Sequence, residues 1–322
     1  MSALTPARLG KEIAAFLVFK RALGHSYRRG AATLRSLQRF ALRRRRARAR
    51  IDLESTIRVW LLRSAGRKPV TLANDLGAVR QFCLYLRRSD PTTFVPPVTL
   101  APQTESRHVT YVFSPEEIRR LIKAAQQHQG RNFWPGMLQM LLIATYCTGL
   151  RLGEAVRLQQ SDLDQGRRVL HIRESKGRSR DVPFQADLAE QFARYLRERT
   201  KLLHACGQAD EPALFVGLNG RRVTVNATSC AITRLLRRLG MKSQAGRCGP
   251  RPYDLRHAFA VHRLTAWYRD GVDLHARLPW LSVYMGHLNV LGTEVYLHAT
   301  PELLEFASER FSAQFAQPGE RS

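Results

Sequence analysis

A tyrosine near the C-terminus, Tyr296, lies in a context that suits nucleophilic chemistry. It follows His287 by nine residues in the stretch LSVYMGHLNVLGTEVYLHAT at positions 281–300. A phenol with its ordinary pKa of about 10 is a poor nucleophile, so it needs a proton acceptor or a strongly cationic pocket around the electrophile. The chain places three basic residues in promising contexts upstream: Arg151, Lys176 and Arg256. Cations beside one phenol suit attack on a phosphate.

Taken singly, each of these residues also has an ordinary structural explanation. Arg151, in the motif TGLRLGE, lies where an apolar helix gives way to the next one, and Glu154 could hold it by an i,i+3 contact. Lys176 follows the pattern of a solvated lysine at a hairpin tip, where a mobile ammonium could also donate a proton. His287 could cap a helix, and Tyr296 could be a half-buried structural tyrosine. The order of the motifs along the chain therefore has to decide between the structural and the functional interpretation.

The motif YDLRH, residues 253–257, opens a helix after the sequence PRP. Tyr253 and Arg256 are three residues apart and share one helical face. Helix N-termini favour phosphates, because their backbone N–H groups lack partners within the helix. His257, considered alone, fits a packed core histidine better than an acid or base.

The charge balance points to a polyanionic partner. The chain of 322 residues has 52 Lys and Arg against 26 Asp and Glu, a formal net charge of +26, and only seven of the 52 are lysines. Arginine binds phosphate bidentately, so nucleic acid is the expected partner. Genomic base composition would explain the preference for arginine over lysine, but not the two-fold excess of basic over acidic residues. A hydrophobic content of 44% is that of a globular protein.

A run of arginines, RRRRARAR at residues 43–50, strengthens this expectation. Six like charges in eight residues repel each other unless an anion is near, so we interpret the run as a contact to the phosphate backbone; the alternative is a solvated face or loop. No aromatic residue interrupts it, so it should add affinity and not read sequence. The predicted DNA-contacting residues are Arg43, Arg44, Arg45, Arg46, Arg48, Arg50 and, at the hairpin, Arg178.

Several other classes of site lack support. The five cysteines are scattered, odd in number and without a CxxC pair, so neither a disulfide framework nor a zinc site is supported. No HxH or HExxH pattern suggests a catalytic metal, and no GxxxxGK[ST] loop suggests ATP use. The longest apolar run, residues 137–147, is shorter than the ~20 residues of a membrane span, and no signal peptide opens the chain. We expect a cytoplasmic, nucleoid-associated protein without a cofactor.

Hydrophobic periodicity predicts two helical parts joined by a linker. Residues 1–90 contain four amphipathic stretches, which form a small bundle, and Asp52 is the expected N-cap of the third. Residues 91–112 contain four prolines and predict an extended linker. The second part opens with FSPEEI, where Ser114 and Glu117 match a capping box and Phe113 with Ile118 a hydrophobic staple.

The second part is predicted to be mostly helical with one small antiparallel sheet. Two short β segments, 169–174 and 181–184, flank the hairpin SKGRS that carries Lys176. An apolar helix over residues 137–146 should be central. Further helices are expected at 185–203, 229–239, 252–268, 279–285 and 301–315.

In order, the motifs are TGLRxxE, a hairpin lysine, DLRH, MGH and a tyrosine nine residues after that histidine. This series resembles the tyrosine recombinases, or phage integrase family, over residues 113–315. The resemblance implies a two-domain DNA clamp that is mainly α with a small antiparallel sheet. Residues 1–90 would be the four-helix core-binding domain, 91–112 the linker, and 113–322 the α+β catalytic domain.

The resemblance also implies roles. Tyr296 would attack a DNA phosphodiester and form a 3′-phosphotyrosine, with Arg151 and Arg256 on the non-bridging oxygens. Lys176 would protonate the departing 5′-oxygen, and His287 would hydrogen-bond the same phosphate, with Glu154 and His257 in support. A metal would not be needed, because the arginines and Lys176 would do the work of a Mg²⁺ ion. ATP would not be needed, because the covalent bond conserves the phosphodiester energy.

One position departs from the family pattern, which usually has histidine where this chain has Tyr253. That histidine is assigned a general-base role, whereas a tyrosine is a weak base at neutral pH. The base role is then dispensable, or supplied by His257 or a water, or activity is reduced. We expect Tyr253 to position the phosphate without deprotonating Tyr296.

The implied partner is double-stranded DNA, bound by a homotetramer on two sites, with residues 301–322 docking onto a neighbouring protomer. An accessory protein or partner recombinase is compatible with this arrangement. The activity could serve integration, excision or transposition of a mobile element, or resolution of chromosome dimers. The alternatives are relaxation of DNA by a type IB topoisomerase-like enzyme, or a catalytically impaired DNA-binding member of the family.

Overall fold

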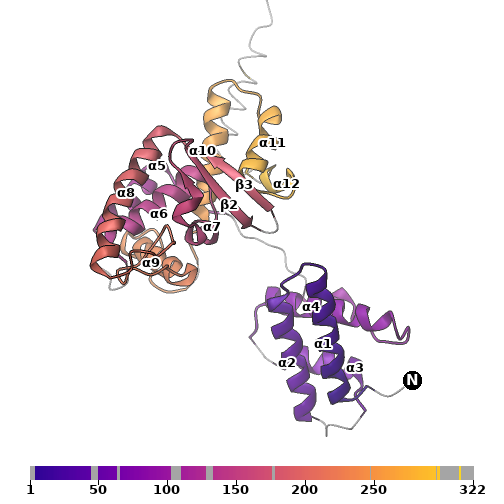
Figure 1. Cartoon of the computed structure of the whole chain (residues 1–322). Coiled ribbons are helices and arrows are strands. Elements are labelled where there is room, and N and C mark those ends of the chain that lie inside the picture. The colour runs from indigo at the N-terminus through magenta and orange to yellow at the C-terminus, as the bar shows by residue number, and fades with distance from the viewer. Residues whose placement is uncertain are drawn as a thin grey trace, which may run out of the picture. The chain divides into compact units, whose positions relative to one another are not determined.

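The computed structural model describes residues 4–44, 50–63, 66–102, 110–127, 133–175, 178–246, 248–294, 296–297 and 312. The chain divides into two compact units, Met1–His108 and Val109–Ser322, coloured from indigo to magenta and from magenta to yellow in Figure 1. Each unit has its own hydrophobic core. The part of the chain that the structure describes contains no helix long and apolar enough to cross a membrane.

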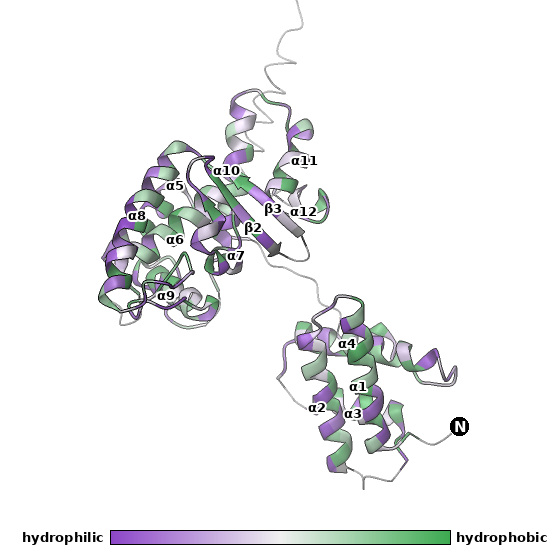
Figure 2. Cartoon of the chain, in the orientation of Figure 1, coloured by the Kyte–Doolittle hydropathy of each residue, from purple (hydrophilic) through white to green (hydrophobic). Residues whose placement is uncertain are grey.

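The N-terminal unit is the predicted helical bundle. Its helices are α1 (Pro6–Ala22), α2 (Arg28–Arg44), α3 (Leu53–Leu62) and α4 (Pro69–Arg87). Asp52 caps α3 as predicted, since its carboxylate accepts a hydrogen bond from the Glu54 N–H at 3.1 Å. Each helix turns one apolar face inward, and Figure 2 shows hydrophobic and hydrophilic residues alternating around α1 and α2. The core is built on fully buried side chains that include Phe16, Leu34, Leu37, Ile57, Trp60 and Phe82.

The first half of the predicted linker belongs to this bundle. Residues 98–100 form a short 3₁₀ helix, Ala101 is buried, and Phe94 and Val95 pack against the bundle core. The Arg80 guanidinium also donates a hydrogen bond to the Pro96 carbonyl at 2.6 Å. The prolines leave this segment without helical periodicity, but its apolar side chains still pack against the core, because an extended segment can cover a core as well as a helix can.

The C-terminal unit opens with the capping box that the sequence predicts. In α5 (Pro115–Gln126), the Ser114 hydroxyl accepts from the Glu117 N–H at 3.2 Å, and the Glu117 carboxylate accepts from the Ser114 N–H at 2.9 Å. The apolar helix α6 (Pro135–Thr148) follows and is buried in the core. It ends at Gly149, whose φ of 62° is the left-handed conformation that glycine adopts easily.

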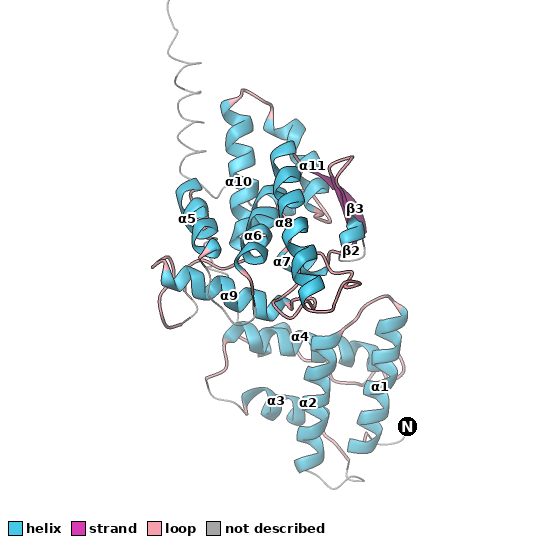
Figure 3. Ribbon diagram, turned by 60° about the vertical axis from the view of Figure 1, so that its left-hand side comes forward, coloured by secondary structure: helices cyan, strands magenta, loops and turns pink. Residues whose placement is uncertain are grey.

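A three-stranded antiparallel sheet lies beside the helices, in the order β1 (Leu163–Asp164), β2 (Val169–Ser175) and β3 (Arg178–Pro183). Figure 3 shows the strands at one side of this unit, next to α11. In the β2–β3 register, Ile172 pairs with Arg180 and His171 with Asp181. Because paired residues share one face of a sheet, Arg180 lies on the same side as the buried Ile172.

The remaining helices begin at residues that differ somewhat from the predictions. They are α7 (Leu152–Arg157), the 3₁₀ turn η2 (Gln160–Asp162), α8 (Ala186–Ala205), α9 (Val225–Arg238), α10 (Asp254–Arg269), α11 (Leu274–Met285) and α12 (Leu291–Glu294). The predicted start of α11 at Pro279 is wrong. The helix begins five residues earlier, at Leu274, where Asp273 caps it, and Pro279 lies inside it at the cost of one backbone hydrogen bond.

Other boundaries moved by a few residues. Helix α9 starts at Val225 because the Thr224 hydroxyl caps it, four residues before the predicted start. The predicted terminal helix, residues 301–315, lies outside the described residues except for Ser312. The predicted fold class, mainly helical with one small antiparallel sheet, is confirmed.

Candidate active site

Three arginines from different elements converge on the C-terminal end of α11. Arg180 of β3 donates from Nε to the Tyr284 carbonyl at 2.8 Å. Arg256 of α10 donates to the Met285 carbonyl at 2.6 Å, and Arg151, at the start of α7, donates to the Gly286 carbonyl at 3.1 Å. The last carbonyls of a helix have no partner within the helix and carry a partial negative charge, so they suit guanidinium groups. The helix end therefore holds the three side chains in place.

Gly286 is required by this convergence. Its φ of 69° ends α11 in the left-handed conformation. A Cβ atom at this position would lie 2.7 Å from Nη1 of Arg180, inside normal contact distance. Glycine therefore lets the backbone turn and lets the Arg180 guanidinium approach the chain closely.

Arg256 is the most buried of the site's cations, with 1% of the residue exposed. It donates a second hydrogen bond to the Gly149 carbonyl at 2.6 Å, while its Nε is buried without a hydrogen-bond partner among the described residues. Burial lowers the pKa of Arg256 to about 10, and the nearby Arg151 cation acts in the same direction. The group remains cationic at neutral pH, so the chain holds a positive charge in a poorly solvated place.

Glu154 organises Arg151 as the sequence predicts. Its Oε1 accepts from the Arg151 guanidinium at 2.6 Å and its Oε2 accepts from the Arg151 N–H at 3.0 Å. The second cation on this carboxylate was not predicted. Arg180 donates from Nη2 to Oε2 at 2.9 Å and from Nη1 to Oε1 at 3.3 Å. A weak signal was available, since Arg180 follows the predicted hairpin at a position whose cross-strand partner is apolar.

Tyr296 lies beside these cations and close to two imidazole rings. The residue is 3% exposed, and its ring centroid is 5.2 Å from that of His257 and 6.1 Å from that of His287. Burial raises the pKa of the Tyr296 phenol, while the Arg256 charge, a hydrogen bond from Arg256 and the Arg151 charge oppose this effect. The phenol is therefore protonated at neutral pH and electrostatically linked to both arginines.

His287 is held on the segment that leads to the tyrosine. Its N–H donates to the Ser282 carbonyl at 2.9 Å, which seats the residue directly after the end of α11. Its Nδ1 forms a 2.7 Å hydrogen bond with the hydroxyl of the buried Thr293 in α12. The Tyr296 N–H in turn donates to the Thr293 carbonyl at 3.0 Å. Thr293, which was not among the predicted site residues, therefore links the two residues.

Tyr253 and His257 form the other side of the site. Tyr253 precedes α10 and is 45% exposed, so its phenol is open to solvent. Its ring centroid is 4.9 Å from that of His257, one turn further along the helix. The imidazole of His257 thus contacts both the ring of Tyr253 and the ring of the buried Tyr296.

Seven of the predicted residues are brought together: Arg151, Glu154, Tyr253, Arg256, His257, His287 and Tyr296. Lys176 and the side chain of Arg178 lie outside the described residues, as do Arg45, Arg46, Arg48 and the side chain of Arg44. Arg43 and Arg50 are exposed. Within the described ranges, no group of three or more His, Cys, Asp or Glu side chains could hold a metal ion. Two guanidinium groups beside a buried phenol suit nucleophilic attack on a bound anion.

Comparisons with known proteins point to one family. The family model described as "Phage integrase family" matches residues 112–302. The chain is 36% identical over 261 residues to the protein named "Putative integrase/recombinase y4rB" of Sinorhizobium fredii, covering 80% of this chain and 82% of that one. It is 28% identical over 248 residues to the tyrosine recombinase XerC of Pelotomaculum thermopropionicum, covering 76% and 75%.

Two solved structures share the fold. The Tn1549 transposon integrase in complex with transposon right end DNA has a TM-score of 0.66 at 18% identity, covering 98% of this chain and 100% of that one. A lambda integrase dimer bound to a COC′ core site has a TM-score of 0.63 at 13% identity, covering 92% and 78%.

Proposed function

The chain belongs to the phage integrase family of tyrosine recombinases, and we propose that it is a site-specific DNA recombinase that works through a 3′-phosphotyrosine at Tyr296. Family membership establishes DNA recombination as its field of activity. The observation that carries the finer proposal is the buried Tyr296 phenol, linked electrostatically to Arg256 and Arg151 and close to two imidazoles.

The proposed reaction is a phosphoryl transfer in two steps, cleavage and rejoining. The Tyr296 oxygen attacks phosphorus, the bond to the 5′-oxygen breaks, and Lys176 gives that oxygen a proton. Arg151 and Arg256 stabilise the negative charge that builds on the non-bridging oxygens, which is typically the largest contribution of such donors. A 5′-hydroxyl from a second strand then attacks the phosphotyrosine and releases Tyr296. One phosphodiester is exchanged for another, so no external energy source is required.

Removal of the phenol proton is the step at which this chain differs from the family pattern, because Tyr253 stands where the family usually has a histidine. Burial raises the pKa of Tyr296, so the proton has to leave as the phenol attacks. A tyrosine hydroxyl can donate or accept a hydrogen bond but is a poor proton acceptor, and Tyr253 is 45% exposed, so we assign it a hydrogen bond to the phosphate. The proton then passes to His257, whose ring contacts Tyr296, or to water.

The test is a search for the covalent intermediate. Wild type and Tyr296→Phe are incubated with nicked duplexes tiled across the DNA that flanks the gene, with EDTA and without ATP. A nick lets the cleaved end diffuse away, which traps the intermediate. We expect an SDS-resistant protein–DNA adduct with wild type only. DNA binding without an adduct on every duplex would contradict the proposal and favour the catalytically impaired alternative.

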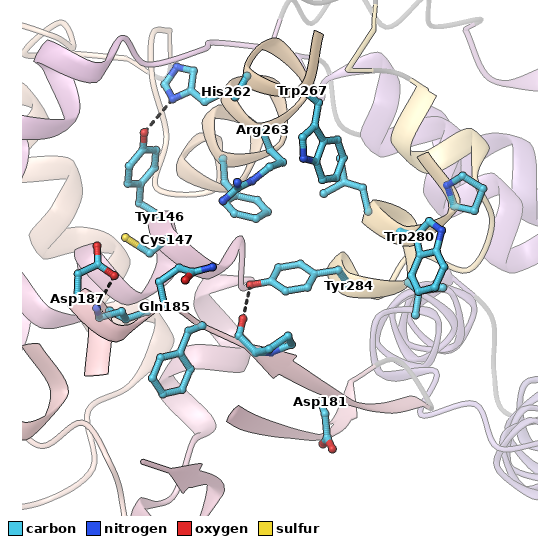
Figure 4. A pocket seen from close by; sticks show the side chains of 18 residues that line it. Tyr146, Cys147, Asp181, Gln185, Asp187, His262, Arg263, Trp267, Trp280 and Tyr284 are labelled. Carbon is cyan, nitrogen blue, oxygen red and sulfur yellow. Dashed lines mark hydrogen bonds between the residues drawn. The ribbon is translucent and has the colours of Figure 1, made fainter. Parts of the chain in front are cut away.

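A pocket beside α11 supports the proposed assembly into a tetramer. It has a volume of about 990 Å³ and lies between α10, α11, the end of α6 and the turn from β3 to α8. Figure 4 shows Trp267, Trp280 and Tyr284 around it, with the Tyr284 hydroxyl donating to the Pro183 carbonyl at 3.0 Å. Trp280 is 71% exposed, an unusual state for a large apolar side chain.

We assign this pocket to residues 301–315 of a neighbouring copy. The spacing of Leu304, Ala307, Phe311 and Phe315 predicts one apolar helical face, which an apolar pocket would cover. Docking between copies is what the family resemblance implies for this segment. Its chemistry matches the lining, because both surfaces are largely aromatic or aliphatic.

The assembly proposal is tested with two variants that remove either side of the contact. A chain truncated after residue 300 and the variant Trp280→Ser should each bind a single site, measured by gel shift, but lose cooperative assembly on two sites. Val225→Ser, an exposed apolar residue on α9, serves as the control and should assemble like wild type. Unchanged assembly of the truncated chain would refute the proposal.

A further inference from the structure

The ion cluster behind Arg151 contains two cations and one anion. Glu154 has 1% of its side chain exposed, and the side chains of Arg151 and Arg180 are 16% and 10% exposed. Both guanidinium groups contact the same carboxylate, at 2.6 Å and 2.9 Å. Charges this poorly screened by solvent act strongly on one another and on whatever binds beside them.

The charge balance of this cluster depends on Arg180. With both arginines the net charge is +1, so an anion that approaches Arg151 meets a cationic cluster. Without Arg180, the Glu154 carboxylate would be paired with Arg151 alone and the pair would be neutral. Glu154, which orients Arg151, would then also neutralise the positive charge with which Arg151 binds an anion.

The hydrogen bonds of Arg180 are directed to Glu154 and to the end of α11. Its Nε is committed to the Tyr284 carbonyl, and both of its terminal nitrogens donate to Glu154. It lies on the core-facing side of β3, opposite Ile172. Gly286, whose missing side chain leaves it room, adjoins its guanidinium. Arg151 instead divides its hydrogen bonds between Glu154 and the end of α11.

We propose that Arg180 is a positioning residue that neutralises Glu154, so that Glu154 can orient Arg151 without cancelling its charge toward the scissile phosphate. This inference rests on the proposed phosphate-binding role of Arg151. It predicts that the defect of an Arg180 variant is electrostatic, and that removing the Glu154 charge repairs it.

The first measurement does not depend on cleavage. In a Tyr296→Phe background, DNA binding is followed against salt concentration for the unchanged cluster, Arg180→Gln, Arg151→Gln and the double variant Arg180→Gln/Glu154→Gln. Each phosphate that loses its cation reduces the magnitude of the negative slope of log affinity against log salt by about one. We expect this loss in both single variants and its recovery in the double variant. An unchanged slope in Arg180→Gln would overturn the inference even if Tyr296 proved not to be the nucleophile.

The second measurement uses the reaction itself. On a nicked duplex, Arg180→Gln should form the adduct about 10²-fold more slowly, and the double variant should regain about tenfold of that loss. On a duplex with a neutral methylphosphonate at the scissile position, the penalty of Arg180→Gln should shrink to about threefold or less, because the charge to be stabilised is smaller. Arg180→Lys, which keeps the charge, should fall between wild type and Arg180→Gln.

These outcomes separate the inference from the proposed function. A penalty that is equal on both substrates and is not relieved by Glu154→Gln would mean that Arg180 acts only in folding. Thermal unfolding of each variant shows directly whether the fold is intact. If wild type formed no adduct on any duplex, the proposed function would fail, and the salt slopes would still decide the role of Arg180.

Discussion

Arg256→Lys isolates the geometry of the most buried guanidinium while keeping its charge. The native side chain donates to the Gly149 and Met285 carbonyls at 2.6 Å each and is 1% exposed. An ammonium is a compact donor on a flexible stem and lacks the planar fork that spans two carbonyls and a phosphate together. The substitution should therefore leave the charge near the site and remove its fixed position.

The expected magnitude follows from two contributions. Removing one fixed donor to a developing oxyanion typically costs 10²–10³ in rate, about 2.7–4 kcal/mol. A retained charge about 4 Å away is worth about 4 kcal/mol at an effective dielectric constant of 20, so lysine should keep much of the electrostatic contribution. We expect Arg256→Lys to form the covalent adduct about 10²-fold more slowly than wild type. Affinity for DNA should change by less than about tenfold, because this is one phosphate contact among several.

The assay is single-turnover adduct formation on a saturating nicked duplex. Arg277→Lys, an exposed arginine of α11, is the matched control and should react at the wild-type rate. Thermal unfolding confirms that both variants are folded. A rate for Arg256→Lys within threefold of wild type would contradict this prediction, because it would show that the fixed hydrogen bonds of Arg256 contribute little to the stability of the transition state.

Four further predictions follow from individual contacts. Adduct formation should be faster at pH 8.5 than at pH 6.5, because burial raises the pKa of Tyr296 and its proton has to be lost; a flat profile would contradict this. Gly286→Ala should destabilise the fold by about 1–2 kcal/mol in thermal unfolding and slow cleavage, since φ is 69° and the new Cβ would meet Arg180. Tyr253→Phe should reduce adduct yield while DNA binding persists, and full cleavage would exclude a phosphate contact. Ser114→Ala should cost about 1 kcal/mol of stability through its lost cap and leave cleavage by the folded protein unchanged.

Much of the site could be predicted because its chemistry is concentrated in short motifs. The order of the motifs indicated Arg151, Glu154, Arg256, His287 and Tyr296 together, although each had an ordinary explanation alone. Local helix signals were equally informative where a side chain caps the backbone directly, as at Asp52 and Ser114. In both cases the determining interaction lies within three residues along the chain.

The features that were missed depend on long-range contacts. Arg180 was one arginine among many near a basic hairpin, and only the sheet register and its contacts to Tyr284 and Glu154 distinguish it. The start of α11 was predicted at Pro279 because proline is common in the first turn of a helix. Here the Asp273 cap and tertiary packing outweigh the one backbone hydrogen bond that is lost at Pro279. Residues 91–102 were assigned to a linker because packing by an extended chain leaves no periodicity.

The most direct test of the central claim is to identify the residue that carries the DNA. Adduct from wild type is digested with nuclease and trypsin, and mass spectrometry is used to locate the phosphate on the peptide of residues 278–310, which contains only two tyrosines, Tyr284 and Tyr296. We expect phosphate on Tyr296 and a free 5′-hydroxyl on the released strand. Phosphate on Tyr284 or on a residue outside this peptide, or a 5′-phosphate on the released strand, would contradict the role proposed for Tyr296.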